Sequence, residues 1–393
     1  MKSFLFCCLW LAAFTVQSQT YSRHILTGAD QMDRYLPLLK NKKVALLVNQ
    51  TSVIQRTHLV DTLLDLNIQI AQIFAPEHGF RGTGDAGEKM KSGIDAKTGL
   101  RITSMYGASK KPSAESMKGI DVVVFDIQDV GARFYTYISS LQYMMEACAE
   151  SKVPLIILDR PNPNGFYVDG PVLERKYASF VGMQSIPIVH GMTVGEYARM
   201  LNGEGWLSGK KKCTLTVIPC LHYDHSMLYE LPIAPSPNLK SSTAILLYPS
   251  LCLFEGTDVS VGRGTTTPFE LWGHPTFKQF SFAFTPVPMP GAKTPPHLNK
   301  TCYGRDLRKT PEEILKVLNG KLNLSFLQEA YQQQNDSAKF FNSFFEKLSG
   351  TAQLRLQIIR HQSDAAIRKS WEPALTQFKK VRKKYLLYPD FAS

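Results

Sequence analysis

The sequence predicts an α/β fold, in which a doubly wound parallel sheet is followed by a second, smaller α+β domain. Near-continuous runs of Val, Ile and Leu recur in the first half of the chain, as in strands that are buried on both faces. Segments with apolar residues at helical spacing separate these runs. Such alternation implies parallel strands that are connected by helices on both faces of the sheet.

The strands and helices of the sheet domain are expected between residues 20 and 230. The predicted strands are the apolar runs at 44–48, 70–74, 122–125, 155–158, 186–189 and 215–218. Helical spacing predicts helices at 59–67, 138–150 and 194–202. Thr193 precedes the last of these, and Glu196 follows three residues later, which is the pattern of a capping box.

The alternation of strand-like and helix-like segments ends near residue 235, where prolines occur at positions 232, 235 and 237. Residues 243–300 hold short apolar runs with many Gly and Pro, and residues 311–333 and 338–384 are predicted to be helical. Pro311 suits the first turn of a helix, and the two glutamates after it favour the positive end of the helix dipole. We therefore divide the chain into residues 1–18, 19–235 and 236–393.

The first 18 residues have the pattern of a secretory signal peptide. Lys2 supplies the positive start, residues 4–16 are apolar, and Val16 and Ser18 suit cleavage before Gln19. The apolar run is short for a membrane anchor. We expect a periplasmic protein with no stable membrane insertion once the signal is removed. Five cysteines then remain, an odd number without a CxxC pair.

The amino-acid composition limits the classes of molecule that this protein is expected to bind. Hydrophobic residues make up 44% of the chain and charged residues 20%, which is typical of a globular protein and excludes a disordered one. The formal net charge is +12. Nucleic acid is an unsuitable partner for an exported protein, whereas a basic surface suits an anionic polymer outside the cytoplasm, such as cell-wall glycan.

Several familiar motifs are missing or out of place. Residues 82–87 match the dinucleotide fingerprint by letter, but they do not follow the first strand directly, so we expect no nucleotide cofactor. No Gly-x-Ser-x-Gly elbow is present. His222 and His225 lack an evident third ligand, so we expect no metal.

Polar residues gather directly after the predicted strands. In open α/β sheets ligands bind beyond the carboxyl ends of the strands, so this rim is the expected site. Each residue could instead serve the scaffold, as in a loop salt bridge between Glu77 and Arg81 or a buried ion network around Asp126. Planar amides, carboxylates and aromatic rings suit sugars. The residues expected to bind substrate are Asn49, Gln50, Arg81, Asp126, Gln128, Asp129, Arg133, Tyr135, Asp159, Arg160, Asn162 and Arg263.

Five longer stretches carry a resemblance. They are Pro76-Glu-His-Gly79, the run from Phe125 to Tyr137, Leu158-Asp-Arg-Pro-Asn-Pro163, the run from Glu255 to Gly264, and the ending from Trp371 to Pro389. In this order they resemble the NamZ family of exo-β-N-acetylmuramidases, glycoside hydrolase family 171. The likeness extends from about Gly28 to Asp390.

The resemblance implies a Rossmann-like N-terminal domain, a C-terminal auxiliary domain and a cleft between them. It also implies release of N-acetylmuramic acid from the non-reducing end of peptidoglycan fragments, without nucleotide or metal. The matching glutamates are Glu77 and Glu174. A glycosidase usually needs one carboxylic acid and one carboxylate, so we expect Glu77 to be the general acid and Glu174 its partner. His78 could instead be the acid, or could orient Glu77.

An arginine is expected to bind the lactyl carboxylate that distinguishes muramic acid, because a guanidinium binds a carboxylate bidentately. Arg133, Arg160 and Arg263 are the candidates. Two other classes of protein remain open. A periplasmic sugar- or muropeptide-binding protein would hold its ligand without turnover. A different cell-wall hydrolase, such as an amidase, would usually need zinc or a nucleophilic Ser or Cys.

Overall fold

The computed structural model describes residues 25–81, 92–107, 109–334 and 337–391. The predicted signal peptide and the glycine-rich stretch at 82–87 lie outside these residues. Within them, the first half of the chain forms a seven-stranded sheet in the order β5-β6-β4-β1-β7-β8-β9. The strands are β1 (Val44–Val48), β4 (Ile70–Ala75), β5 (Gly93–Ile94), β6 (Arg101–Ser104), β7 (Val122–Asp126), β8 (Leu155–Leu158) and β9 (Leu215–Ile218).

All neighbouring strands of this sheet are parallel except β5, which pairs antiparallel with β6. The predicted doubly wound parallel sheet is thereby confirmed. Strand β1 lies between β4 and β7, and each of its five residues is buried. Its apolar sequence follows from this position, because a central strand has helices on both faces and no polar face.

Alternate side chains of the central strands enter two separate cores. Leu46 and Val124 pack with α1 (Met32–Leu39) and α2 (Leu59–Asp65). Leu47 and Val123 face the opposite side and pack with α4 (Tyr137–Ser151) and α5 (Val194–Gly203). This division follows from the two-residue period of a strand. The capping box of Thr193 and Glu196 at the start of α5 is present as predicted.

One predicted strand is absent. Residues 186–189 form no ladder, although Val189 makes isolated bridges with Ala132 and Asp169. This extended segment packs under the loops that follow the sheet. Its backbone groups form hydrogen bonds with these loops, so they need no neighbouring strand. The hairpin of β2 (Val53–Ile54) and β3 (Thr57–His58) was not predicted, because each strand has only two residues.

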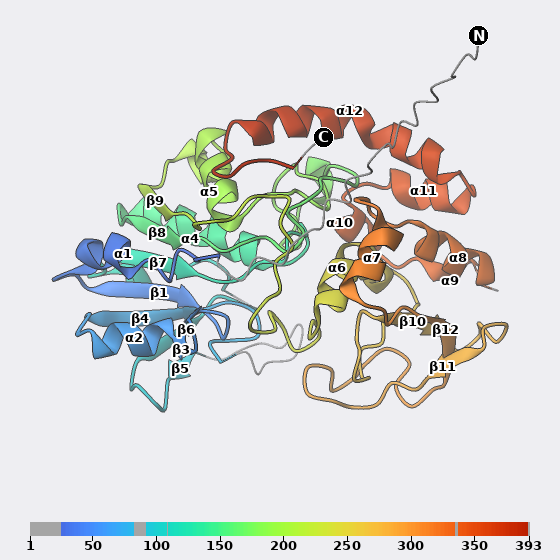
Figure 1. Ribbon diagram of the computed structural model, residues 1–393, viewed down its shortest axis with the longest axis horizontal. Helices are drawn as coiled ribbons and strands as arrows, with labels where there is room; N and C mark the ends of the chain where they lie inside the picture. Colours follow the sequence, from blue (N-terminus) through green and yellow to red (C-terminus); the bar gives the residue numbers. More distant parts are fainter. Residues whose placement is uncertain (1–24, 82–91, 108, 335–336, 392–393) are drawn as a thin grey trace, which may run out of the picture.

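The second half of the chain combines a small antiparallel sheet with helices (Figure 1). Helix α6 (Ser242–Leu251) continues into the 3-10 turn η3 (Cys252–Gly256). The sheet has the order β10-β12-β11, with β10 (Leu271–His274), β11 (Phe282–Phe284) and β12 (Cys302–Asp306). The helices that follow are α7 (Pro311–Leu318), α8 (Ser325–Gln333), α9 (Ser337–Phe340), α10 (Phe345–Ser349), α11 (Gln353–Ile359) and α12 (Asp364–Lys383).

Positive-φ residues divide the two long helices that the sequence predicted. Asn319 and Gly320 have φ of 49° and 64°, so α7 ends there and α8 starts a new direction. Gly350, with φ of 80°, ends α10 in the same manner. A side chain on Gly350 would also meet the Arg133 guanidinium, with a Cβ only 2.7 Å from one of its nitrogens.

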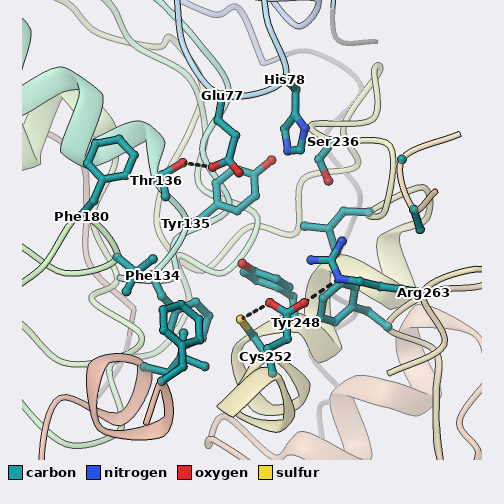
Figure 2. Close-up of a pocket in the computed structure, with 18 of the residues that line it drawn as sticks. Glu77, His78, Phe134, Tyr135, Thr136, Phe180, Ser236, Tyr248, Cys252 and Arg263 are labelled. Carbon is teal, nitrogen blue, oxygen red and sulfur yellow. Dashed lines mark hydrogen bonds and ion pairs between the residues drawn. The ribbon is translucent and has the colours of Figure 1, made fainter. Parts of the chain in front are cut away.

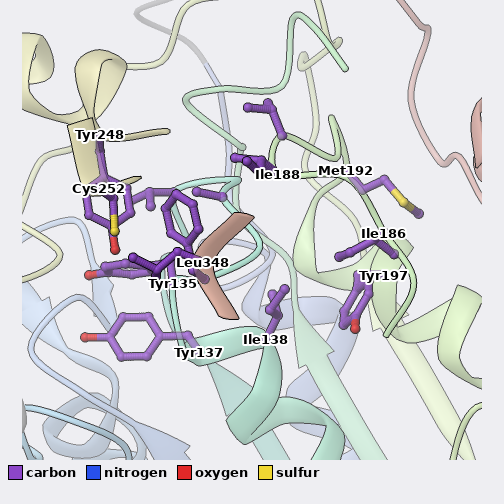
Figure 3. Packing of buried hydrophobic residues seen from close by; sticks show 14 of the residues in the cluster. Tyr135, Tyr137, Ile138, Ile186, Ile188, Met192, Tyr197, Tyr248, Cys252 and Leu348 are labelled. Carbon is purple, nitrogen blue, oxygen red and sulfur yellow. The ribbon is translucent and has the colours of Figure 1, made fainter. Parts of the chain in front are cut away.

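Contacts on two sides of the molecule illustrate how the two halves are held together. Helix α12 returns across the top of the sheet domain in Figure 1, and Arg382 near its end donates to the Gly191 carbonyl. Behind the cleft, Tyr135 of the sheet domain packs edge-on against Tyr248 of α6, with ring centroids 5.7 Å apart (Figure 3). Because these contacts are buried, the halves share one core.

The cysteines of the described chain are all buried and none forms a disulfide. Among the described residues, no helix is both long and apolar enough to cross a membrane.

Candidate active site

A cavity of about 550 Å³ lies between the two halves of the chain. Glu77 and His78 point into it from the sheet domain, and Tyr248 and Arg263 face them from the second domain (Figure 2). Aromatic rings, two glutamates and three basic side chains share its surface. The lining residues used below are Glu77, His78, Tyr106, Lys110, Tyr135, Thr136, Phe180, Tyr248, Glu255, Arg263 and Lys293.

A tight turn after β4 presents Glu77 to the cavity. The Gly79 amide donates to the Pro76 carbonyl at 3.0 Å, which closes the turn. His78 has φ of 69° and is therefore in the left-handed region, where residues other than glycine are uncommon. Such a conformation costs on the order of 1–3 kcal/mol and tends to occur at functional sites. The turn thus holds Glu77 and His78 together at the end of a buried strand.

Two hydroxyl groups orient the Glu77 carboxylate. Thr136 Oγ1 donates to Oε2 of Glu77 at 2.7 Å. Thr136 occupies the N-cap position of α4 but makes no capping bond with its side chain, so its hydroxyl is given to Glu77 instead. The Tyr106 phenol also contacts Glu77: burial and then this nearby carboxylate raise the pKa of Tyr106.

The opposite wall carries a second glutamate. Glu255, in η3, accepts a hydrogen bond from Arg263 Nε at 2.5 Å and one from the Cys252 thiol at 3.5 Å, shown as dashed lines in Figure 2. Burial alone would lower the pKa of Arg263, but the Glu255 carboxylate more than offsets this, so the pKa is raised. Arg263 and Glu255 thus form an ion pair on this wall.

Aromatic rings form much of the remaining walls, and the half-buried Lys110 lies beside one of them. Lys110 Nζ lies 5.3 Å from the centroid of the Phe180 ring and 3.1 Å from the Gly107 carbonyl. Such a cavity offers two carboxylates for proton transfer, flat apolar faces and a positive charge. This combination suits an anionic carbohydrate.

Two family models match the chain in succession. The N-terminal model of the exo-beta-N-acetylmuramidase NamZ matches residues 44–243, and its C-terminal model matches residues 246–388. The chain belongs to the NamZ family. Glu77 lies within the first match and Glu255 within the second, so both walls of the cavity are parts of the family's two regions.

Full-length relatives agree with this assignment. The chain is 39% identical over 386 residues to the peptidoglycan beta-N-acetylmuramidase NamZ of Bacillus subtilis (strain 168), covering 93% of this chain and 91% of that protein. Two crystal structures of DUF1343 family proteins from Bacteroides fragilis NCTC 9343 share the fold. They have TM-scores of 0.87 and 0.74 at 50% and 28% identity, and each comparison covers 93% of this chain and 99% of the other.

Of the site residues that the sequence suggested for this NamZ-family protein, four line the cavity. They are Glu77, His78, Tyr135 and Arg263. Glu174 does not. Its carboxylate accepts from Thr351 Oγ1, forms an ion pair with Lys176 at 3.0 Å, and is nearly half exposed. We therefore correct the prediction that Glu174 is the partner of Glu77, because the second glutamate of the cavity is Glu255.

Two of the three candidate arginines are part of the scaffold. Arg133 is fully buried, and its guanidinium donates to the carbonyls of Pro171, Ile186 and Leu348. Burial lowers its pKa to about 9. Arg160 forms a buried bidentate pair with Asp126, at 2.5 and 2.9 Å. Their proposed roles in substrate binding are corrected, since neither guanidinium reaches the cavity.

The buried polar residues after β7 and β8 are likewise used by the fold. Asp129 accepts from the Gly131 amide, and burial raises its pKa to about 7. Asp159 accepts from Thr193, Gly195 and Tyr388, and burial raises its pKa to about 6. Each carboxylate stabilises a loop through these bonds, so we correct the prediction that Asp129 and Asp159 bind substrate.

The remaining predicted binding residues also bond within the protein. Gln128 donates to the backbone of Asp129 and Pro161, and Gln50 donates to the backbone of Ala234 and Pro235. The others do the same: Asn49 accepts from Thr51, Asn162 donates to Met192, and Arg81 pairs with Asp95. We correct these assignments too, because none of these side chains lines the cavity.

Sequence reasoning missed several residues that line the cavity. Glu255 belongs to a stretch that carried the family resemblance, where attention to carboxylates as well as to Arg263 would have found it. Tyr106 and Lys110 follow β6, a strand of four residues that are partly or fully exposed, so it has no apolar run to mark it. The only sequence feature that could have pointed to Thr136 is its position between Tyr135 and Tyr137.

Proposed function

We propose that this protein is an exo-acting glycoside hydrolase that releases N-acetylmuramic acid from the non-reducing ends of peptidoglycan fragments. The names of its relatives support this, since the family models are described as exo-beta-N-acetylmuramidase NamZ and the Bacillus subtilis protein as a peptidoglycan beta-N-acetylmuramidase. The observation that carries the proposal for this chain is the pair of glutamates, Glu77 and Glu255, placed by two domains on one cavity. Glycosidases usually place a pair of carboxyl groups on either side of the scissile bond.

The contacts suggest a role for each glutamate. The Arg263 guanidinium, 2.5 Å away, places a positive charge beside Glu255, as suits a carboxylate that acts as a base, a nucleophile or a group that stabilises a developing positive charge. The proton-donating role then belongs to Glu77, which the hydroxyls of Thr136 and Tyr106 hold in place. His78, beside it on the turn, would orient the leaving group or relay its proton.

The direct test is incubation with the disaccharide of N-acetylmuramic acid β-1,4-linked to N-acetylglucosamine. Mass spectrometry should detect the two free sugars. With longer glycan chains, an exo-acting enzyme should release terminal N-acetylmuramic acid before any internal fragment appears. A protein that binds the disaccharide and leaves it intact would contradict the proposal and indicate a binding protein.

The lactyl carboxylate is proposed to bind Lys110. Glu255 already holds the Arg263 guanidinium, whereas the Lys110 ammonium lies at the edge of the cavity over Phe180. A hydrogen bond to a charged group contributes about 1.5–3 kcal/mol, or roughly 10- to 150-fold in binding. We therefore expect Lys110→Met to lower the preference for muramic acid over N-acetylglucosamine glycosides by at least tenfold.

The measurement is kcat/KM on matched aryl glycosides of the two sugars. Lys118→Met is the control, because Lys118 is exposed and lies outside the cavity in the same domain. Arg263→Met and Lys293→Met complete the series, since both residues line the cavity. An unchanged preference in Lys110→Met together with a lost preference in one of these would transfer the role to that residue.

Export to the periplasm is also proposed, on the basis of the signal pattern in residues 1–18. Mass spectrometry of the protein from its native host should find a chain that starts at Gln19. A chain that retains residues 1–18 in the cytoplasmic fraction would contradict the proposal.

A further inference from the structure

Three side chains from separate segments of the second domain converge beside the cavity. They are Asp258, just after η3, His274, the last residue of β10, and His297, in the loop before β12. Each can offer one ligand atom, and these atoms all lie within 4.8 Å of one another. This group could not be predicted from the sequence, because the three residues are spread over 40 positions and form no recognised spacing.

The orientation of both imidazoles fits metal binding. His297 Nε2 lies 2.6 Å from the Asp258 carbonyl oxygen. A carbonyl can only accept, so Nε2 donates and Nδ1 is the nitrogen left to bind a metal. His274 Nδ1 lies 2.8 Å from Thr276 Oγ1, while Nε2 lies 2.9 Å from the Asp258 carboxylate. The Thr276 amide also donates to Nδ1 at 3.2 Å, so without a metal Nε2 carries the proton and donates to Asp258. Binding of a metal through Nε2 would move the proton to Nδ1, where the Thr276 hydroxyl can accept it, as the supporting partner of a metal-bound histidine does.

Burial and charge also suit a cation. His274 is only 6% exposed, so its packed surroundings hold the ring in one orientation. The Asp258 side chain is about half exposed and can rotate, which leaves one side of the group open to water. Bonds of about 2.1 Å in a tetrahedral zinc site place ligand atoms about 3.4 Å apart, so a contraction of roughly 1 Å would complete the site.

The backbone connects this group of three side chains to the wall of the cavity. The Asn299 amide donates to the Pro286 carbonyl at 2.8 Å and closes the loop of residues 286–299. His297 holds a left-handed conformation there, with φ of 57°. Pro295 and Pro296, directly before it, line the cavity, and Asp258 lies three residues after Glu255. Anything that joins His297 to Asp258 therefore fixes this loop against the wall that bears Glu255.

We propose that Asp258, His274 and His297 bind one divalent transition-metal ion, zinc by its ligand preference, with water completing the coordination. The ion clamps the loop of residues 286–299 onto the second domain. It acts outside the cavity and takes no part in proton transfer. The proposal does not depend on the reaction that the cavity performs.

The test is metal binding by the full chain after treatment with a chelator. Titration with zinc against a chromogenic chelator should show one tight site per chain. His297→Gln, His274→Gln and Asp258→Asn should each weaken it by at least about tenfold, because even the loss of a supporting contact weakens metal sites by about 10–100-fold. His222→Gln is the control, since His222 is exposed and outside the group.

Two further measurements keep the test decisive if a variant folds poorly. Cobalt(II) added to the unaltered chain should give the strong visible absorption of a four- or five-coordinate site, and zinc should displace it. Zinc should also raise the midpoint of thermal unfolding of the unaltered chain and of His222→Gln, because a ligand that binds only the folded state stabilises it. No tight site in the unaltered chain, or equal affinity in all variants, would overturn the proposal and leave a hydrogen-bonded Asp–His cluster.

Discussion

Replacing Glu77 by Gln is expected to reduce turnover of the natural muramoyl disaccharide by about 10²–10⁴-fold, the usual contribution of a general acid. Gln has the same shape and can still bond to Thr136, but it cannot deliver a proton to the leaving sugar oxygen. The loss should therefore fall on kcat more than on KM. Steady-state kinetics with the disaccharide, followed by the release of free N-acetylmuramic acid, measure it.

The leaving group separates the roles of the two glutamates. A nitrophenolate needs little protonation, so Glu77→Gln should retain much more activity on a nitrophenyl glycoside of N-acetylmuramic acid than on the disaccharide. Glu255→Gln should lose activity on both, because a good leaving group does not replace a base, a nucleophile or a stabilising charge. If the two variants show the reverse pattern, the roles are exchanged.

Glu174→Gln is the matched control. Glu174 is a glutamate of the same domain as Glu77, but its carboxylate bonds to Thr351 and Lys176 away from the cavity. It should keep near-normal turnover on both substrates. Thermal unfolding of all three variants would show that they are folded. A folded Glu77→Gln protein with normal turnover of the disaccharide would refute the assignment of the acid.

The central part of the fold was readable from the sequence, because burial on both faces leaves a distinct apolar run. Strand β1 is the clearest case, with five buried residues in five positions. Strand β6 could not be predicted, since its four residues are partly or fully exposed and form no such run. Residues 186–189 have the composition of a strand, yet their backbone bonds to loop residues such as Arg133 and Asp169 rather than to a strand of the sheet.

The site was only partly readable for a different physical reason. Polar residues after strands do gather at one rim, but the sequence does not show which of them bond to one another. Asp126 forms an ion pair with Arg160, and Asp159 accepts a hydrogen bond from Tyr388, which lies near the opposite end of the chain. Because of such partners, most of the polar side chains at the rim stabilise the fold and are not available to bind substrate. Glu77 differs because a strained turn directs it outward, and Glu255 joins it only through the packing of two domains.

The pair of Asp126 and Arg160 leads to the second large expected effect, which concerns stability. Asp126 is fully buried and Arg160 is 3% exposed, and the guanidinium also donates to the Val53 carbonyl at 2.9 Å. Removing one partner leaves the other charge buried without compensation. We expect Asp126→Asn and Arg160→Met each to lower the free energy of unfolding by about 3–5 kcal/mol.

The double replacement of Asp126 by Leu and Arg160 by Met should cost less than either single change, because it leaves no unpaired charge and replaces the pair by apolar groups. Urea unfolding followed by tryptophan fluorescence measures all three. Lys97→Met is the matched control: Lys97 pairs with Asp61 at 2.5 Å in the same domain, but its side chain is 65% exposed, so the loss should stay below about 1 kcal/mol. If the double variant lost as much as the two single variants together, Asp126 and Arg160 would contribute independently, and the stabilising role of their pairing would be disproved.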